Sequence, residues 1–142
     1  EVITGADKLI MIDVYDALMV SNVGSDLQIM QIFYNHNVSY IFKATSANSI
    51  SIVIWERDFD KKLIRELEAT FEKVNVEKTA MVCMLGTNMD QPGLLARAAS
   101  ALTEAGINIM SAGFALRKVN IQFLVAREHF KDAVIALNAA MA

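Results

Sequence analysis

The first half of the chain alternates between short apolar runs and stretches in which apolar residues recur three or four positions apart. Short runs rich in Ile and Val are typical of strands, whereas the wider spacing is typical of amphipathic helices. A glycine-containing loop, VSNVGSD, separates the first run from the first helical stretch. In chain order this half predicts a strand at 8–14, a helix with Leu27, Met30 and Phe33, strands at 38–44 and 49–55 joined by a turn at 45–48, and a helix with Phe59, Leu63, Ile64, Leu67 and Phe71 on one face.

The second half repeats this order of elements. Gly106 stands where glycine commonly ends a helix. Residues 74–78 (VNVEK), between the halves, predict a strand that closes the first unit. The elements predicted after it are a strand at 79–85, a helix at 92–105, strands at 107–112 and 119–125, and a helix at 129–141.

The two halves are copies of one unit. Arg57 and Arg127, like Leu67 and Leu137, are separated by 70 positions. Each copy has the order βαββαβ, which predicts an α+β fold of two ferredoxin-like units, each an antiparallel sheet with helices on one face. We assign residues 1–78 to the first unit and 79–142 to the second. Because units of this size are marginally stable alone and have open sheet edges, we expect them to pair within the chain or across a dimer.

The start of the second unit's first helix combines Asp90, Pro92 and Gly93. Proline suits the first helical turn, and an acid just before it complements the helix dipole. Glycine is unfavourable inside a helix, so Gly93 indicates a close approach of the backbone to something else. Either the helix packs tightly on a strand there, or the free amides of its first turn bind a small anion.

Composition narrows the function. The 142 residues are 54% hydrophobic and 20% charged, with a net charge of −3, which argues for a folded protein and against a nucleic-acid partner. No apolar run is long enough to span a membrane, so we expect a cytoplasmic protein without a membrane partner. The opening EVITGADK lacks an initiator methionine and suggests a segment of something longer. Lone Cys83, His36 and His129 have no partners at metal-ligand spacing, which predicts no metal site.

The segment DQPGLLARAASALTEAGINI resembles the ACT domain pattern of an acid, Pro-Gly, an apolar helix and Gly-Ile-Asn-Ile. In the order ITGADK, GSDLQIMQIFYNHNVSYIFKATSANSISI, AGINIMSAG and VNIQFLV, the whole chain resembles the C-terminal regulatory region of bacterial aspartate kinases, which contains tandem ACT domains. The segment SYIFKATSANSI is similar to the variant of the ectoine pathway. ACT domains are ferredoxin-like modules that bind free amino acids.

This resemblance implies a non-catalytic regulatory chain with no catalytic residues of its own. ATP and Mg would belong to a separate kinase domain of the parent, which phosphorylates L-aspartate, and the chain would form a homodimer through its ACT units. The backbone amides near Gly24 would receive the α-carboxylate of an effector such as lysine or threonine, and Asp26 or a strand carbonyl its α-ammonium. The residues expected at this effector site are Met19, Ser21, Asn22, Gly24, Ser25, Asp26, Val38, Tyr40, Thr45 and Ser46.

Some positions depart from the family pattern. Ile41 replaces an acid that would suit a lysine side chain, and Ser25 replaces a bulky apolar residue. In the second unit, small polar residues are replaced by the segment 114–116 (FAL), which predicts a site filled by side chains and a packing role for Gly93. We expect Asn108 and Asn120, both in predicted strands, to bond across a unit interface. The alternative function is a structural dimerisation module with a degenerate effector site, in a kinase insensitive to feedback. A small enzyme or an RNA-binding domain fits neither the acidic charge nor the absence of a catalytic cluster.

Overall fold

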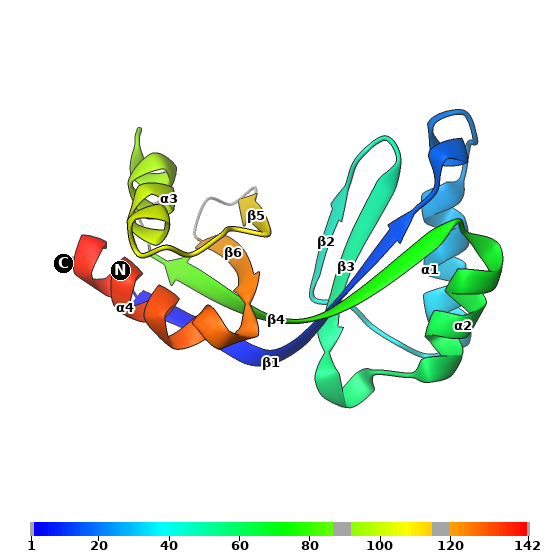
Figure 1. Ribbon diagram of the computed structural model, residues 1–142, viewed down its shortest axis with the longest axis horizontal. Coiled ribbons are helices and arrows are strands. Elements are labelled where there is room, and N and C mark those ends of the chain that lie inside the picture. Colours follow the sequence, from blue (N-terminus) through cyan, green and yellow to red (C-terminus); the bar gives the residue numbers. More distant parts are fainter. Residues whose placement is uncertain (1, 87–91, 115–119, 142) are drawn as a thin grey trace. The chain divides into compact units, whose positions relative to one another are not determined.

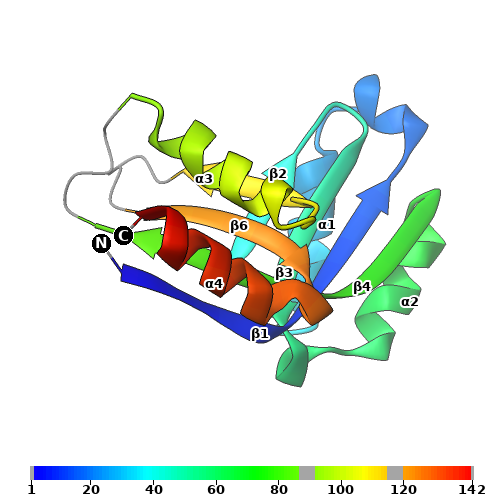
Figure 2. The ribbon, with the colours of Figure 1, turned by 60° about the vertical axis from the view of Figure 1, so that its left-hand side comes forward.

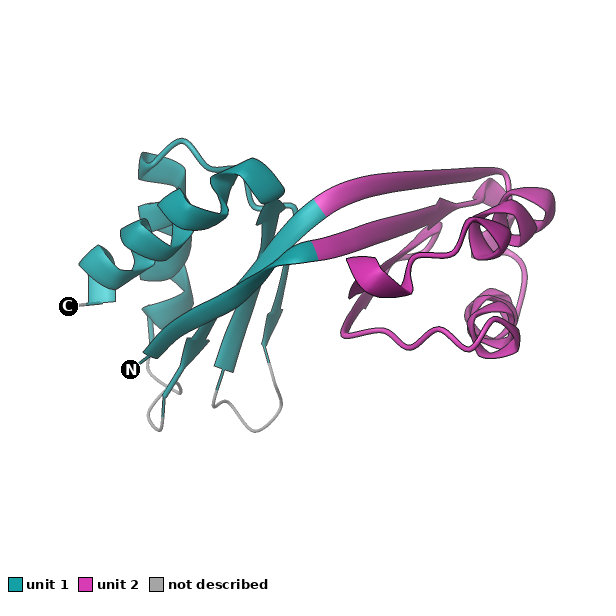
Figure 3. Cartoon of the chain, turned by 90° about the horizontal axis from the view of Figure 1, so that it is seen from below, with its two compact units in different colours: residues 1–8, 79–142 teal, residues 9–78 magenta. Residues whose placement is uncertain are grey.

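The computed structural model describes residues 2–86, 92–114 and 120–141, and it contains two compact units (Figure 1). One unit is Leu9–Lys78, and the other combines Glu1–Lys8 with Thr79–Ala142 (Figure 3). The strand order β2-β3-β1-β4-β6-β5 accounts for both, because β1 and β4 each contribute residues to both units. Each unit is described by itself below.

The unit of residues 9–78 has the predicted βαββαβ order, with a sheet ordered β2-β3-β1-β4. Antiparallel pairing of β1 with β3 sets Ile12 opposite Ile52, and β2 pairs with the far side of β3. Its elements are β1 (Val2–Tyr15, here from Leu9 onward), η1 (Ala17–Val20), α1 (Ser25–Asn35), β2 (Phe42–Thr45), β3 (Ser49–Trp55), η2 (Glu56–Asp58), α2 (Lys61–Thr70) and the first part of β4 (Lys73–Leu85).

Alternation along the strands builds the core of this unit. Every second residue of β1 and β3 points to the face that α1 and α2 cover. From the helices, Phe33, Leu63 and Leu67 bury themselves against these strands, each at most 2% exposed. Full burial of such a side chain contributes about 1.5–3 kcal/mol. The core strand residues are Ile10, Ile12, Val14, Ile50, Ile52 and Ile54.

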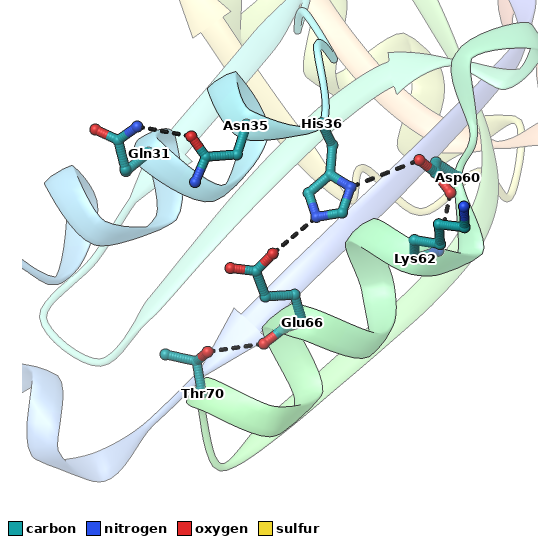
Figure 4. A network of polar contacts seen from close by, with 7 residues as sticks. All are labelled: Gln31, Asn35, His36, Asp60, Lys62, Glu66 and Thr70. Carbon is teal, nitrogen blue, oxygen red and sulfur yellow. Dashed lines mark hydrogen bonds and ion pairs between the residues drawn. The ribbon is translucent and has the colours of Figure 1, made fainter.

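Polar contacts fasten α1 to α2. His36 is the C-cap of α1, and its Nε2 lies 2.8 Å from Glu66 Oε1 on α2 (Figure 4). Its Nδ1 lies 3.7 Å from Oδ2 of Asp60. Asp60 is also the N-cap of α2, where its other oxygen accepts from the N–H of Lys62 at 2.9 Å. His36 therefore caps the end of α1 and has two carboxylates of the α2 region as neighbours.

The unit of residues 1–8 and 79–142 has the same order of strands, β1-β4-β6-β5, with α3 and α4 packed on one face (Figure 2). Leu137, 70 positions after Leu67, is fully buried like its counterpart, so the repeat is visible in the packing. Its remaining elements are α3 (Leu94–Glu104), β5 (Ser111–Phe114), β6 (Asn120–Ala126), η3 (Arg127–His129) and α4 (Phe130–Met141).

The first eight residues lie with the second unit, whereas the sequence analysis assigned them to the first. The physical reason is visible at Gly5 on β1. A Cβ added there would collide with the carbonyl oxygen of Met81 on β4 and lie 2.8 Å from the ring of Phe130. Glycine is needed for that close approach, and the N-terminal part of β1 supplies the edge strand next to β4. The division between residues 78 and 79 coincides with a unit boundary.

Two predicted strands begin later than their apolar patterns indicate. β2 starts at Phe42 and β5 at Ser111, four residues after the predicted starts at 38 and 107. In both places the chain first completes a helix C-terminal turn: the N–H of Val38 donates to Phe33 O, and that of Ile107 to Leu102 O, each at 3.0 Å. The turn needs a left-handed residue, which is Asn37 (φ 56°) in one unit and Gly106 (φ 76°) in the other. The apolar residues Val38 and Ile107 thus belong to the turns that end α1 and α3, and not to the strands that follow.

Candidate functional site

The loop between β1 and α1 is held at its base by carboxylates. Asp16 caps η1, its Oδ1 accepting from the N–H of Leu18 at 2.9 Å. Its Oδ2 accepts from the N–H of Glu72 at 3.1 Å, and Glu72 Oε1 accepts from the N–H of Ala17 at 3.3 Å. The start of the loop is therefore attached to the segment between α2 and β4.

The end of the same loop is Gly24, the N-cap of α1. Its φ of 94° lies in the left-handed region that favours glycine, and a Cβ added there would meet nothing within 4 Å. Gly24 has no side chain that could accept from the first helical turn, so the amides of that turn lack a capping side chain. Such amides, together with the positive end of the helix dipole, suit a carboxylate.

A cavity of about 250 Å³ lies between this loop, the start of α1 and the β2–β3 turn. The turn is closed by Ser46, whose N–H donates to Ser49 O at 2.8 Å. Seven of the ten residues predicted at the effector site line this cavity. Its lining residues are Met19, Asn22, Gly24, Ser25, Asp26, Thr45, Ser46, Ala47 and Ile50.

A second cavity, of about 340 Å³, adjoins the loop on the side of α2. It shares Met19, Asn22 and Ser25 with the first cavity, and it contains Ser21, the eighth predicted residue. Sequence reasoning missed its contribution from the end of α2, because a contact between residues about 50 positions apart leaves no local pattern. Its lining residues are Asp16, Leu18, Met19, Ser21, Asn22, Val23, Ser25, Gln28, Thr70 and Phe71.

Val38 and Tyr40 line neither of these cavities. Val38 packs against the hydrophobic core, as its place in the helix-ending turn requires. Tyr40 is 44% exposed, and its ring centroid lies 5.7 Å from Nζ of Lys43. Their predicted direct contact with the effector has no support from the cavity geometry of the unit.

Asp26 lines the cavity as predicted, but its carboxylate already has a partner. Nζ of Lys43 donates to Asp26 Oδ1 at 2.7 Å and to Oδ2 at 2.9 Å. The side chain of Lys43 is 18% exposed and that of Asp26 49%. Lys43 was not among the predicted site residues, because a lysine in a strand usually reads as a solvent-facing position. Asp26 therefore enters any binding event as half of an ion pair.

In the second unit the structure corrects the interpretation of Gly93. A Cβ at Gly93 would meet nothing within 4 Å, so tight packing is the wrong explanation. Gly93 is the N-cap of α3 with φ 82°, and the left-handed conformation is what requires glycine. The helix begins at Leu94, two residues after Pro92. Asp90 lies outside the described residues.

The other predicted site residues of the second unit, Asn108 and Asn120, do not form a cluster with Gly93 around a described cavity. Asn108 is exposed and precedes β5 instead of lying in it. Asn120 opens β6 opposite Leu85, and its amide oxygen is buried without a hydrogen-bond partner in the structure. Phe114 is 44% exposed, while residues 115 and 116 lie outside the described residues, so the filled second site stays a prediction.

The described residues offer little else for chemistry. Within 2–86, 92–114 and 120–141, no group of three or more His, Cys, Asp or Glu side chains could hold a metal ion. No helix in those ranges is long and apolar enough to cross a membrane. Burial raises the pKa of the Cys83 thiol above its ordinary 9.0, which disfavours the reactive thiolate. Around its cavity the first unit presents a helix start, hydroxyl-bearing residues and one ion-paired carboxylate, groups that suit hydrogen bonds with a small polar molecule.

Comparison with known proteins supports the fold. Residues 82–141 match the ACT domain family. The chain is 29% identical over 147 residues to the aspartate kinase Ask_Ect of Stutzerimonas stutzeri (strain A1501), a match that covers 99% of this chain and 30% of that protein. The chain thus spans about a third of the length of that relative.

Solved structures share the fold. The aspartate kinase of Clostridium acetobutylicum superposes with a TM-score of 0.91 at 24% identity, over 99% of this chain and 34% of that one. The regulatory subunit of aspartate kinase from Thermus flavus superposes with a TM-score of 0.84 at 15% identity, over 99% of this chain and 97% of that one. The predicted α+β fold, with helices on one face of an antiparallel sheet in each unit, is confirmed.

Proposed function

We propose that the chain is a regulatory region of the aspartate kinase type with an ACT domain, and that it binds a free amino acid and controls a kinase domain. The observation that carries this proposal is the cavity of the first unit. Residues from two separate segments, 19–26 and 45–50, meet around a single space of about 250 Å³, and seven of them are residues that the sequence predicts at the effector site. That size suits a molecule as small as an amino acid.

The cavity offers complementary groups for both ends of an α-amino acid. The amides at the start of α1, beyond Gly24, would donate to the α-carboxylate. Asn22, Thr45 and Ser46 line the same space, and their side-chain oxygen atoms would accept from the α-ammonium. Ser21 and the second cavity lie next to this site, so the loop between β1 and α1 would respond to an occupant on either side.

We also propose a homodimer that forms near this loop. Four apolar side chains there are far more exposed than is usual: Leu18 (62%), Val20 (68%), Val23 (104%) and Leu27 (72%). Clustered exposed apolar side chains of this kind are typical of interaction surfaces. A second copy covering them would place the effector site next to the interface, so that occupancy and association would influence each other.

The signal would pass to a cytoplasmic aspartate kinase, the proposed parent protein. ATP and Mg would be held in its kinase domain and not by this chain. Lysine or threonine is the proposed effector, and a coupling free energy of about 1–3 kcal/mol between effector and kinase sites would be typical. An effector shifts the kinase only if it binds its two states differently.

Titration calorimetry of the chain with lysine, threonine, methionine and aspartate tests this proposal, with the molar mass measured alongside. We expect heat from one of them with a Kd of roughly micromolar to millimolar. Thr45→Ala is expected to weaken that binding, whereas Thr103→Ala, on the exposed face of α3 in the other unit, is its matched control. Unchanged binding in Thr45→Ala would move the site away from this cavity, and the absence of heat with all four amino acids would refute the sensor function.

The ion pair of Asp26 with Lys43 favours a second candidate function, a structural dimerisation module with a degenerate effector site. Because Asp26 is already paired with Lys43, its carboxylate is less available to the ammonium group of a ligand. This alternative predicts a stable dimer that gives no heat with any of the four amino acids.

A further inference from the structure

We propose that Lys43 determines the charge selectivity of the first-unit cavity, admitting amino acids with neutral polar side chains and rejecting those with a cationic side chain. The inference deepens the proposed function and rests on it. The ammonium of Lys43 would occupy the carboxylate of Asp26, which is the group that a ligand with a lysine-like side chain would need.

The geometry of the ion pair supports this role. Lys43 lies on β2 opposite Ile52 of β3, and its ammonium reaches both oxygens of Asp26 at the start of α1. The ring of Tyr40 lies beside the same ammonium, with its centroid 5.7 Å away. With only 18% of its side chain exposed, Lys43 is held in this position by its surroundings. A carboxylate that binds one ammonium through both oxygens forms a strong, charge-assisted pair, and both of its oxygens are then engaged.

The remaining lining of the cavity carries no other charge that could receive a cation. Asp26 is the single ionisable side chain among the residues that surround it. A second ammonium at Asp26 would stand within a few ångströms of Nζ of Lys43, and like charges at such distances repel each other. A neutral side chain avoids this repulsion and can bond with Asn22, Ser25, Thr45 and Ser46. A hydroxyl-bearing amino acid such as threonine is therefore the class of ligand that fits.

The experiment compares threonine, lysine and norleucine, which has the four-carbon side chain of lysine without its ammonium group. Calorimetry is run on the full chain, on Lys43→Met and on Lys43→Arg. Lys131→Met, exposed on α4 of the other unit, is the matched control for loss of a lysine. We expect the unaltered chain to bind threonine more tightly than lysine, and lysine no better than norleucine. In Lys43→Met we expect lysine affinity to rise about ten-fold relative to threonine, because Asp26 becomes available. Lys43→Arg and Lys131→Met are expected to keep the original order.

A merely structural ion pair would behave differently. Loss of Lys43 would then lower the unfolding temperature and weaken all ligands together, leaving their ratios within two-fold, and that result would overturn the inference. Lys43→Gln serves if Lys43→Met fails to fold. As a second readout, Asp26→Asn added to Lys43→Met is expected to abolish the gained lysine affinity.

The outcomes separate the two proposals. If threonine binds but the ratio of lysine to threonine affinity does not depend on residue 43, selectivity by Lys43 fails while the sensor function stands. If lysine already binds the unaltered chain more tightly than threonine does, the inference is wrong in the same way. If no amino acid binds any variant, both proposals fall.

Discussion

Asp16 and Glu72 each accept a hydrogen bond from the backbone beside the other, at 3.1 Å for the N–H of Glu72 and 3.3 Å for that of Ala17. This reciprocal pairing joins residues 56 positions apart and fixes the base of the loop that borders both cavities. Two carboxylates can lie close together here because each faces backbone N–H groups instead of the other acid. Loop position, and with it the shape of the candidate site, depends on this pair.

Replacing Asp16 by Ala is expected to destabilise the first unit by about 1–2 kcal/mol, since one side chain loses both an η1 cap and a tie to the backbone of Glu72. Amide hydrogen exchange of residues 17–24 is expected to accelerate more than that of the β3 core. Asp58→Ala, an exposed acid in η2, is the control and is expected to change neither quantity. If the loop exchanged at the same rate in Asp16→Ala as in the unaltered chain, Asp16 would not be what holds the loop in place.

Substitutions of Gly93 distinguish a requirement of backbone conformation from a requirement of close packing. Because its φ is 82° and nothing surrounds its missing Cβ, Gly93→Ala is expected to cost about 1 kcal/mol of unfolding free energy from backbone strain alone. Asn tolerates the left-handed conformation, so Gly93→Asn is expected to cost less than Gly93→Ala. Urea denaturation measures both. If the larger Asn proved the more damaging of the two, packing and not backbone conformation would be the constraint.

At Gly5 the cost of a substitution is expected to come from packing and not from backbone strain, because a side chain there has no space. Gly5→Ala would force the carbonyl of Met81 or the ring of Phe130 to move, at a cost of about 1–3 kcal/mol. Thr4→Ala, an exposed neighbour on the same strand, is the control. Hydrogen exchange is expected to increase first in residues 79–85 of β4. An undisturbed β4 in the Gly5 variant would mean that β1 does not approach it this closely.

Burial of Cys83 makes the stability of the chain depend on alkaline pH. Its pKa is raised in the folded chain above the ordinary 9.0. The unfolded chain therefore loses the thiol proton first, so this group's contribution to stability is full below pH 9 and is lost as pH rises through the folded pKa. Unfolding free energies measured from pH 8 to 10 are expected to fall more steeply for the unaltered chain than for Cys83→Ala. Alkylation by iodoacetamide at pH 8 is also expected to be several-fold slower than for the urea-unfolded chain. The prediction would be contradicted if stability fell with pH equally in both chains and if the folded and unfolded chains were alkylated at the same rate.

The sequence predicted those parts of the fold that depend on local pattern. The strand at 49–55 occupies the residues expected from its apolar alternation, and the order βαββαβ is correct in the first unit. In the second unit the order βαββα is correct, but its remaining strand comes from residues 2–8 and not from a segment after the last helix. The strands expected from 38 and 107 start four residues late, because a helix-ending turn and a strand both use apolar residues there. An apolar run does not say which of the two structures it serves.

Contacts between distant segments could not be read in the same way. The pairing of Lys43 with Asp26 and the proximity of Thr70 to the loop depend on how α1, α2 and β2 pack. The placement of residues 1–8 depends on strand order, which a linear division at residue 78 ignores. Glycine at 93 is required by its left-handed conformation and not by close packing, and the residue type alone does not distinguish these two requirements.

The division of β1 between two units has a consequence for the order of events during synthesis. A ribosome releases the N-terminal residues first, at about 5–20 residues per second. Residues 9–78 can complete their own sheet as soon as they emerge, whereas residues 2–8 have no β4 segment to pair with until the region after Thr79 follows. Residues 2–8 are thus made before the β4 segment with which they pair, and the second unit is completed only after the residues of the first unit have been made.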